Sequence, residues 1–290
     1  MVLDFLADLS TPLIMGVLLG GLYALIALGL SLVFGVMKLI NVAHGDLVIM
    51  GTYFAYVAMT VLGIDPILSL VMGIPLLFIV GFGIQKYLMR RAFGISMEAP
   101  FIIAFGISLV LQNFAQIMWT PMSRGLTTSY ALTSFSIGGA YVPLNYLLDF
   151  VAALVVMLCL REFLRRTYLG KAINAASQNR RAAQLMGVNT ERVYAFAFAI
   201  AMATAAIAGV FLGLTFPFTP TSGVSFLIIA FGVVILGGLG SMLGTFIGGM
   251  ILGLAQTLGA HFFGAAAQLL IAYIIVLVVL AVRPQGIFGR

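Results

Sequence analysis

The feature that most constrains this chain is a series of apolar runs, each close to the length that crosses a bilayer. A membrane-spanning helix needs about 20 apolar residues, and its backbone must satisfy its own hydrogen bonds. Barrel strands alternate apolar and polar residues, whereas these runs are apolar throughout. The sequence therefore predicts an all-α polytopic membrane protein with about nine transmembrane helices, and between eight and ten. The runs lie at roughly 12–36, 44–62, 66–85, 99–119, 144–160, 193–216, 224–240, 243–259 and 265–282.

Composition supports one membrane domain that occupies residues 1–290. Hydrophobic residues make up 63% of the chain and charged residues only 8%, whereas soluble domains carry about 25% charged residues. The net charge of +6 would suggest nucleic-acid binding in a soluble protein. In a membrane protein it is better explained by basic loops that set the orientation, so no nucleic-acid partner is expected.

Basic residues predict which loops face the cytoplasm, because such loops carry an excess of Lys and Arg. One basic group spans 86–91, and the loop at 161–192 holds seven of the 14 basic residues. The turn near Asp65 and the Ser/Thr-rich stretch from Pro121 to Pro143 carry few bases and are expected outside. With nine crossings, this pattern places the N-terminus outside and the C-terminus in the cytoplasm.

Glycine spacing predicts close helix packing, with broken or short helices near the C-terminus. The runs at 224–240 and 243–259 meet at GGLGSMLG, which has no charge to fix its side of the membrane. Small residues one turn apart let helix backbones approach closely in lipid. The glycine pattern predicts a tightly packed bundle and leaves open whether a subunit interface lies at 240–253. The G-x-x-x-G pairs are Gly16/Gly20, Gly209/Gly213, Gly240/Gly244, Gly244/Gly248 and Gly249/Gly253.

The loop at 161–192 is much longer than the usual 2–8 residue link between bundled helices. Its segment SQNRRAAQLMG predicts a short helix with an apolar tip and a basic rim, which ends at Gly187. Asn189 and Thr190, with Glu191, are expected to start the next helix. Two interpretations remain open. The short helix either docks on a partner protein or lies on anionic lipid headgroups.

Polar residues inside the apolar runs are candidates for a translocation pathway or gate. Asn41, His44 and Asp46, with Gly45 between them, are expected near the inner end of the second crossing. A charged side chain at mid-membrane costs about 2.5–3.5 kcal/mol, so it usually faces a cavity or a partner. The alternative is that these residues are hydrated at the membrane interface. His44 and Asp46 are two residues apart and do not share a helix face.

Two amides in the fourth run are further pathway candidates. Gln112 and Gln116 are one turn apart and share a face of the predicted helix. Amides at such positions either bind the polar groups of a cargo or hold neighbouring helices together. The sequence leaves both roles open.

The sequence argues against catalysis by the chain itself. It lacks the phosphate-binding pattern G-x-x-x-x-G-K-[ST] and shows no clustered metal ligands or catalytic residues. The single cysteine, Cys159, excludes disulfides within one chain. We therefore expect no enzyme activity, no metal and no cofactor on this chain.

Four segments stand out in the sequence: GLYALIALGLSLVFGVMKLINVAHGDLVIMGTYFAY, YLGKAINAASQNRRAAQLMGVNTERVYAFAFAIAMATAAIAGVFLG, AFGVVILGGLGSMLGTFIGGMILG and RPQGIFG. In this order they show a resemblance to the LivH-type permeases of branched-chain amino acid ABC importers, and the resemblance covers nearly the whole chain. It implies that the short helix in loop 161–192 is a cytoplasmic coupling helix that inserts into a groove of an ATPase. The residues at that contact would be Arg180, Arg181, Ala183, Leu185, Met186 and Gly187.

The same resemblance implies partners and a location. The partners would be a second permease subunit (LivM-like, or a second copy), two cytoplasmic ATPase subunits that carry ATP and Mg, and a periplasmic substrate-binding protein. The chain would lie in the bacterial inner membrane and pass branched-chain or related hydrophobic amino acids. Two alternatives remain. The cargo could be urea, an amide, or an aromatic or dicarboxylic acid, or the chain could be a proton-coupled transporter that uses His44 and Asp46.

Overall fold

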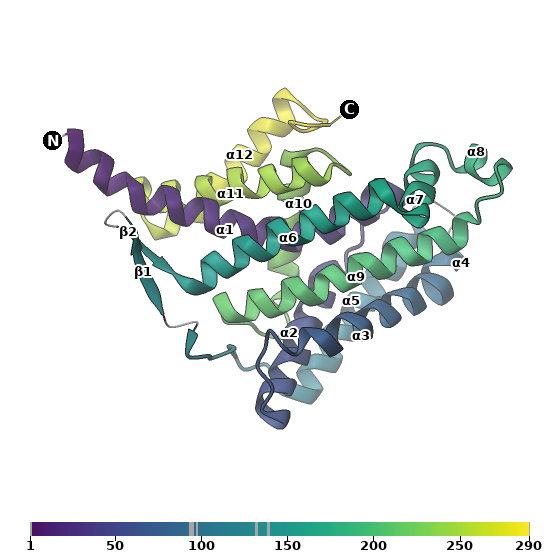
Figure 1. Cartoon of the computed structure of the whole chain (residues 1–290), viewed down its shortest axis with the longest axis horizontal. Helices are drawn as coiled ribbons and strands as arrows, with labels where there is room; N and C mark the ends of the chain where they lie inside the picture. Colours follow the sequence, from purple (N-terminus) through teal and green to yellow (C-terminus); the bar gives the residue numbers. More distant parts are fainter. Residues whose placement is uncertain (1, 93–95, 97, 131–132, 138–139, 290) are drawn as a thin grey trace.

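The computed structural model describes residues 2–92, 96, 98–130, 133–137 and 140–289. Within these residues the chain is mainly helical (Figure 1). A two-stranded antiparallel hairpin, which the sequence analysis did not predict, lies between α5 and α6. The elements are α1 (Val2–Met37), α2 (His44–Leu62), α3 (Leu70–Gly83), the π-helix η1 (Ile84–Met89), α4 (Arg90–Ala92), α5 (Ala99–Trp119), β1 (Ser134–Ile137), β2 (Ala140–Pro143), α6 (Leu144–Arg166), α7 (Tyr168–Gln178), α8 (Arg180–Leu185), α9 (Thr190–Thr215), α10 (Gly223–Gly237), α11 (Met242–Phe263), the 3-10 helix η3 (Ala265–Ala267) and α12 (Gln268–Val282).

Each apolar run of the sequence forms a helix, which confirms the predicted helical polytopic architecture. Among the described residues, seven helices are long and apolar enough to cross a membrane. The helix α10 is apolar but has only 15 residues. The number of nine crossings therefore stays a prediction. The seven spans are Leu9–Met37, His44–Leu62, Leu70–Ala92, Ala99–Trp119, Thr190–Thr215, Met242–Phe263 and Ala265–Val282.

The two predicted inner loops lie at the same end of the molecule. Figure 1 shows α4, α7 and α8 at one end, and the N-terminus with the hairpin β1–β2 at the other. A salt bridge of 2.8 Å between Arg90 and Glu191 joins the first basic loop to the start of α9. The positive-inside rule assigns this end to the cytoplasm, and that orientation remains a prediction.

The predicted glycine spacing produces close contact between α1 and α11. A Cβ atom on Gly20 would lie 2.5 Å from the Cα of Met250, and one on Gly253 would lie 2.3 Å from the carbonyl oxygen of Gly16. Only glycine allows the two backbones to approach this closely. Gly249 and Gly253 are therefore occupied by contacts within the chain, which argues against a subunit interface at these positions.

The predicted break near the C-terminus is confirmed between α10 and α11. Gly238 and Gly240 have φ angles of 96° and 85°, a left-handed conformation that glycine adopts without steric penalty. The C-terminal segment packs against this break. The backbone N–H of Ile287 donates a hydrogen bond to the carbonyl oxygen of Leu236, at the end of α10, over 2.9 Å. The helix α10 is short, whereas α11 has 22 residues and is a full-length helix.

The start of α2 lies deeper in the bundle than the sequence predicted. The Nε2 of His44 lies 2.8 Å from the carbonyl oxygen of Ile26, which is near the middle of the span Leu9–Met37. Residues 38–43 therefore return from the end of α1 to its mid-depth without forming a helix. Such irregular backbone is tolerated in a membrane where protein surrounds it. His44 is nevertheless the first residue of the span His44–Leu62, as predicted for one end of that crossing, and the side of the membrane that this end faces stays a prediction.

The helix α10 begins beside the start of α2. A Cβ on Gly223, the first residue of α10, would lie 2.7 Å from the backbone nitrogen of Asp46. A Cβ on Gly45 would lie 2.0 Å from the carbonyl oxygen of Gly223. Gly45 therefore allows two helices that start within the bundle to touch each other.

Candidate functional site

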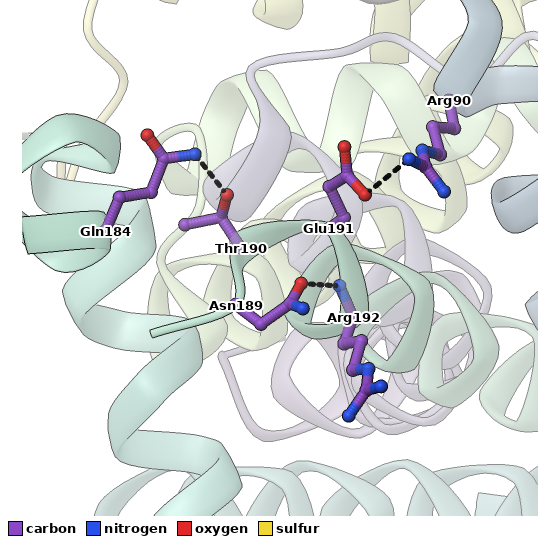
Figure 2. Close-up of polar contacts among 6 residues, drawn as sticks. All are labelled: Arg90, Gln184, Asn189, Thr190, Glu191 and Arg192. Carbon is purple, nitrogen blue, oxygen red and sulfur yellow. Dashed lines mark hydrogen bonds and ion pairs between the residues drawn. The ribbon is translucent and has the colours of Figure 1, made fainter. Parts of the chain in front are cut away.

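The short helix α8 is defined by local caps that the sequence encodes. The Asn179 side chain accepts a hydrogen bond from the backbone N–H of Ala182 at 3.0 Å and starts α8. Gly187 follows the helix with a φ of 83°. Figure 2 shows the next cap, where the Asn189 oxygen accepts from the backbone N–H of Arg192 at 3.1 Å. Both predicted boundaries, at Gly187 and Asn189, are confirmed.

The apolar tip of α8 points away from the rest of the chain. Leu185 is 89% exposed and Met186 is 85% exposed. Of the other predicted contact residues, Arg180, Arg181 and Gly187 are also exposed. Ala183 instead faces inward and is buried against this chain.

Side-chain contacts fix α8 and its turn to the helix bundle. The Gln184 amide donates to the Thr190 hydroxyl at 2.9 Å, and Glu191 pairs with Arg90 (Figure 2). The guanidinium carbon of Arg180 lies 5.6 Å from the centre of the Tyr194 ring. These contacts connect α8 and its turn to α9 and, through Glu191 and Arg90, to α4.

A cavity of about 620 Å³ adjoins this region between η1 and the start of α9. In the sequence, Lys86 and Arg90 indicate only the orientation of the chain, and the cavity could not be predicted from them. The one feature of the sequence that points to the cavity is that two distant loops, at 86–91 and 161–192, are both basic. The cavity is lined by Phe82, Gln85, Lys86, Arg90, Arg180, Asn189, Glu191, Arg192, Tyr194, Ala195 and Phe196.

A second polar cluster lies between α2 and α5. The Ser108 hydroxyl donates to Asp46 Oδ2 at 2.5 Å, and the Gln112 amide donates to the same oxygen at 3.3 Å. The Gln112 amide also lies 3.1 Å from the Ser108 hydroxyl. The structure thus brings Asp46 and Gln112 together, as two of the predicted pathway residues. Ser108 was missed, although it lies one turn before Gln112 on the same face.

The other predicted pathway residues have separate environments. His44 contacts the carbonyl of Ile26 on α1 rather than Asp46, which agrees with the expectation that the two side chains do not share a face. Asn41 is fully buried and its side-chain oxygen accepts from the backbone N–H of Ala43 at 3.2 Å. Gln116 is partly exposed on α5. Asn41, His44 and Asp46 are therefore buried in the bundle rather than hydrated at an interface.

The hydrogen bonds to Asp46 predict a stability effect. Asp46→Leu leaves the buried Ser108 hydroxyl without its acceptor and removes one of the two acceptors of the Gln112 amide, so it should lower the free energy of unfolding by about 1–3 kcal/mol. Asp46→Asn keeps an acceptor oxygen and should therefore retain most of the free energy of unfolding that Asp46→Leu loses. Thermal unfolding of the purified chain in detergent measures both. Equal stability of Asp46→Leu and the unsubstituted chain would contradict this role.

The outward face of α5 differs from the outward faces of other helices. It exposes Asn113 and partly exposes Gln116 among large apolar residues. On α12 the large exposed side chains are apolar, for example Leu270 and Leu277. Lipid tails offer no hydrogen-bond partners to amides, so the α5 face suits contact with protein or water.

Comparison with known proteins assigns the chain to a family. The family model described as "Branched-chain amino acid transport system / permease component" matches residues 13–280. The high-affinity branched-chain amino acid transport system permease protein BraD of Pseudomonas aeruginosa is 33% identical, over 96% of this chain and 95% of that protein. The corresponding protein LivH of Escherichia coli is 32% identical, over 95% of this chain and 94% of its own length.

More distant matches agree on the general class. The ribose import permease protein RbsC of Bacillus subtilis is 30% identical, over 76% of this chain and 69% of that protein. Among solved structures, PsaBC from Streptococcus pneumoniae in complex with Fab matches with a TM-score of 0.52 and 13% identity, over 99% of this chain and 98% of that chain. This last likeness concerns the fold alone. The chain therefore belongs to the family of permease components of branched-chain amino acid transport systems.

Proposed function

We propose that this chain is the transmembrane permease subunit of a binding-protein-dependent ABC importer in the bacterial inner membrane. Its cargo is a branched-chain or related hydrophobic amino acid, and ATP hydrolysis takes place on separate subunits that carry ATP and Mg. The proposal is supported by the family match and by two curated relatives, BraD and LivH, that match nearly the whole chain. The basic end, with α8 and the C-terminus, faces the cytoplasm.

The single observation that carries the ATPase contact is the exposed apolar tip of α8. Leu185 and Met186 are almost fully exposed, on a short helix that is capped at its start and followed by a left-handed glycine. Large apolar side chains in such a position mark an interaction site. Because α8 lies at the end of the bundle (Figure 1), a cytoplasmic subunit is a better partner than the membrane surface.

The contacts of α8 give a route from the ATPase to the membrane helices. Closure of the two ATPases around ATP would move α8, and the Gln184–Thr190 hydrogen bond and the Glu191–Arg90 salt bridge would carry that movement to α9 and to η1 with α4. In turn α9 is in backbone contact with α2, because a Cβ on Gly209 would lie 2.3 Å from the Val48 carbonyl. The helices that hold Asp46 and Gln112 would then rearrange between inward-facing and outward-facing states.

The cargo is assigned from the relatives rather than from a binding pocket. BraD and LivH are both named for branched-chain amino acid transport and cover nearly all of the chain. The relative named for ribose import matches a smaller share of it. Branched-chain amino acids are therefore the cargo to test first, and a periplasmic binding protein would deliver them.

Copurification tests the proposed assembly. The tagged chain, solubilised gently from its native membrane, should retain one or two ATPases and a second permease, which mass spectrometry identifies. The binding protein encoded or purified with them then reports the cargo through its bound ligand. If the chain instead purifies alone and transports in liposomes without ATP, the importer assignment is wrong and proton coupling through His44 and Asp46 becomes the function to test.

The amides of α5 predict where the second permease packs. In a Cys159→Ala background, Gln116→Cys labelled with a thiol-specific, photoactivatable cross-linker should become linked to the second permease in the assembled importer on illumination, detected by gel mobility. Leu277→Cys on α12 is the matched control on an apolar, exposed face and should not cross-link. A cross-link at 277 without one at 116 would place the subunit interface on α12 instead.

A further inference from the structure

The cavity beside the start of α9 has a strongly positive lining, and its volume has no role in the proposed coupling route. Four cationic side chains line it: Lys86, Arg90, Arg180 and Arg192. Glu191 is the carboxylate in the lining, and it is already paired with Arg90 at 2.8 Å. The remaining cations give the cavity an excess of positive charge, which favours an anionic ligand.

The cavity also contains a buried acceptor that points to a hydroxyl-bearing ligand. Gln85 is only 2% exposed, and its Oε1 has no hydrogen-bond partner among the described residues. Burial of a polar atom without a partner is unfavourable, so the Gln85 oxygen calls for an explanation. Gln85 belongs to the π-helix η1, a rare distortion that occurs frequently at functional sites.

One wall of the cavity is aromatic and continues toward the membrane. The ring centres of Phe82 and Phe196 are 5.3 Å apart. Phe78 lies one helical turn before Phe82 on α3, and its ring centre is 6.3 Å from that of Phe196. Beyond them the outward face of α3 exposes large apolar residues, among them Ile79 and Val80. A ligand with a charged head and an apolar tail matches this sequence of surfaces, whereas a free anion or an acidic protein segment would leave the aromatic wall unused.

We propose that this cavity binds the headgroup of an anionic phospholipid of the cytoplasmic leaflet. Lys86, Arg180 and Arg192 hold the phosphate, because basic pockets between membrane helices favour anionic headgroups. A headgroup hydroxyl donates to Gln85 Oε1, which favours phosphatidylglycerol over an anionic lipid without hydroxyls. The acyl chains lie over Phe82 and Phe196 and then along α3.

Native mass spectrometry of the intact importer tests this proposal. The complex is reconstituted in vesicles of phosphatidylglycerol and phosphatidylcholine, extracted gently, and the retained lipid is identified and titrated. Phosphatidylglycerol should be retained, and Lys86→Gln with Arg192→Gln should weaken its binding by about 30-fold, since each basic residue near the surface contributes about 1 kcal/mol and the two together about 2 kcal/mol. The matched control, Arg161→Gln with Lys171→Gln, removes two exposed bases from the same end outside the cavity and should bind as the unsubstituted chain does.

A second variant separates hydroxyl recognition from charge and from folding. Gln85→Leu should remove the preference for phosphatidylglycerol over phosphatidylmethanol, which has the same charge but lacks the glycerol hydroxyls. Equal retention of phosphatidylglycerol by the cavity and control double variants would overturn the proposal. If inorganic phosphate alone stabilises the importer as much as phosphatidylglycerol does, the cavity is a free-anion site and the proposal is overturned. Loss of the lipid whenever the ATPases are bound would assign the cavity to the protein interface instead.

Discussion

Replacing Leu185 and Met186 together with aspartate is expected to abolish ATP-driven uptake while the chain stays folded in the membrane. Both side chains are more than four-fifths exposed, at 89% and 85%, so the change should leave the fold intact. In the proposed complex they enter an apolar groove of the ATPase, where two carboxylates would be desolvated without partners. Truncation of interface hot spots costs 2 kcal/mol or more, which corresponds to association weaker by about 30-fold.

The measurement is uptake of radiolabelled leucine in cells, together with copurification of the ATPases. Tyr168→Asp is the matched control, because Tyr168 is 84% exposed at the same end of the molecule but lies on α7. The double variant should lose both uptake and the ATPases, whereas Tyr168→Asp should keep both. Normal uptake by the double variant would show that α8 is not the coupling helix, and the interpretation as a helix on lipid headgroups would then be preferred.

Gly20→Leu is expected to prevent the chain from folding stably. A Cβ at this position would lie 2.5 Å from the Cα of Met250 and 2.6 Å from the carbonyl oxygen of Gly249. Both neighbours are backbone atoms, so no side-chain rotation relieves the clash and α1 must separate from α11. Overpacking in protein cores typically costs about 1–3 kcal/mol and sometimes more. The free-energy cost of separating two long membrane helices should lie at or above the upper end of this range.

Membrane abundance and thermal unfolding in detergent measure this effect. The control is Gly106→Leu on α5, where an added Cβ meets no heavy atom within 4 Å. We expect Gly20→Leu to be degraded or to unfold at much lower temperature, and Gly106→Leu to accumulate normally. Equal stability of the two variants would mean that the glycine contact between α1 and α11 does not hold the bundle together.

Local features of the candidate site were predicted well from the sequence. Gly187 ends the turn after α8 and Asn189 caps α9, because left-handed glycine and side-chain caps depend on residues only a few positions apart. The exposed pair Leu185 and Met186 also followed from the pattern of the short loop. These signals are local, so they do not depend on how the rest of the chain folds.

The membrane core was predicted less well, and the reason is physical. Lipid tails and a protein interior are equally apolar, so an apolar run does not reveal which of the two a residue contacts. The sequence therefore did not show that His44 lies at the mid-depth of α1, that Ser108 donates to Asp46, or that Ala183 faces inward.

The membrane class, the helical runs, the basic end and the caps around α8 could all be predicted from the sequence. These follow from hydropathy, charge and contacts between near neighbours, which are properties of short segments. The folded chain was needed to show which helices touch, where α2 and α10 begin, and that Lys86 and Arg192 line one cavity. Those outcomes depend on the meeting of segments far apart in the chain, where the fit of backbones at glycines such as Gly20 and Gly223 selects one arrangement.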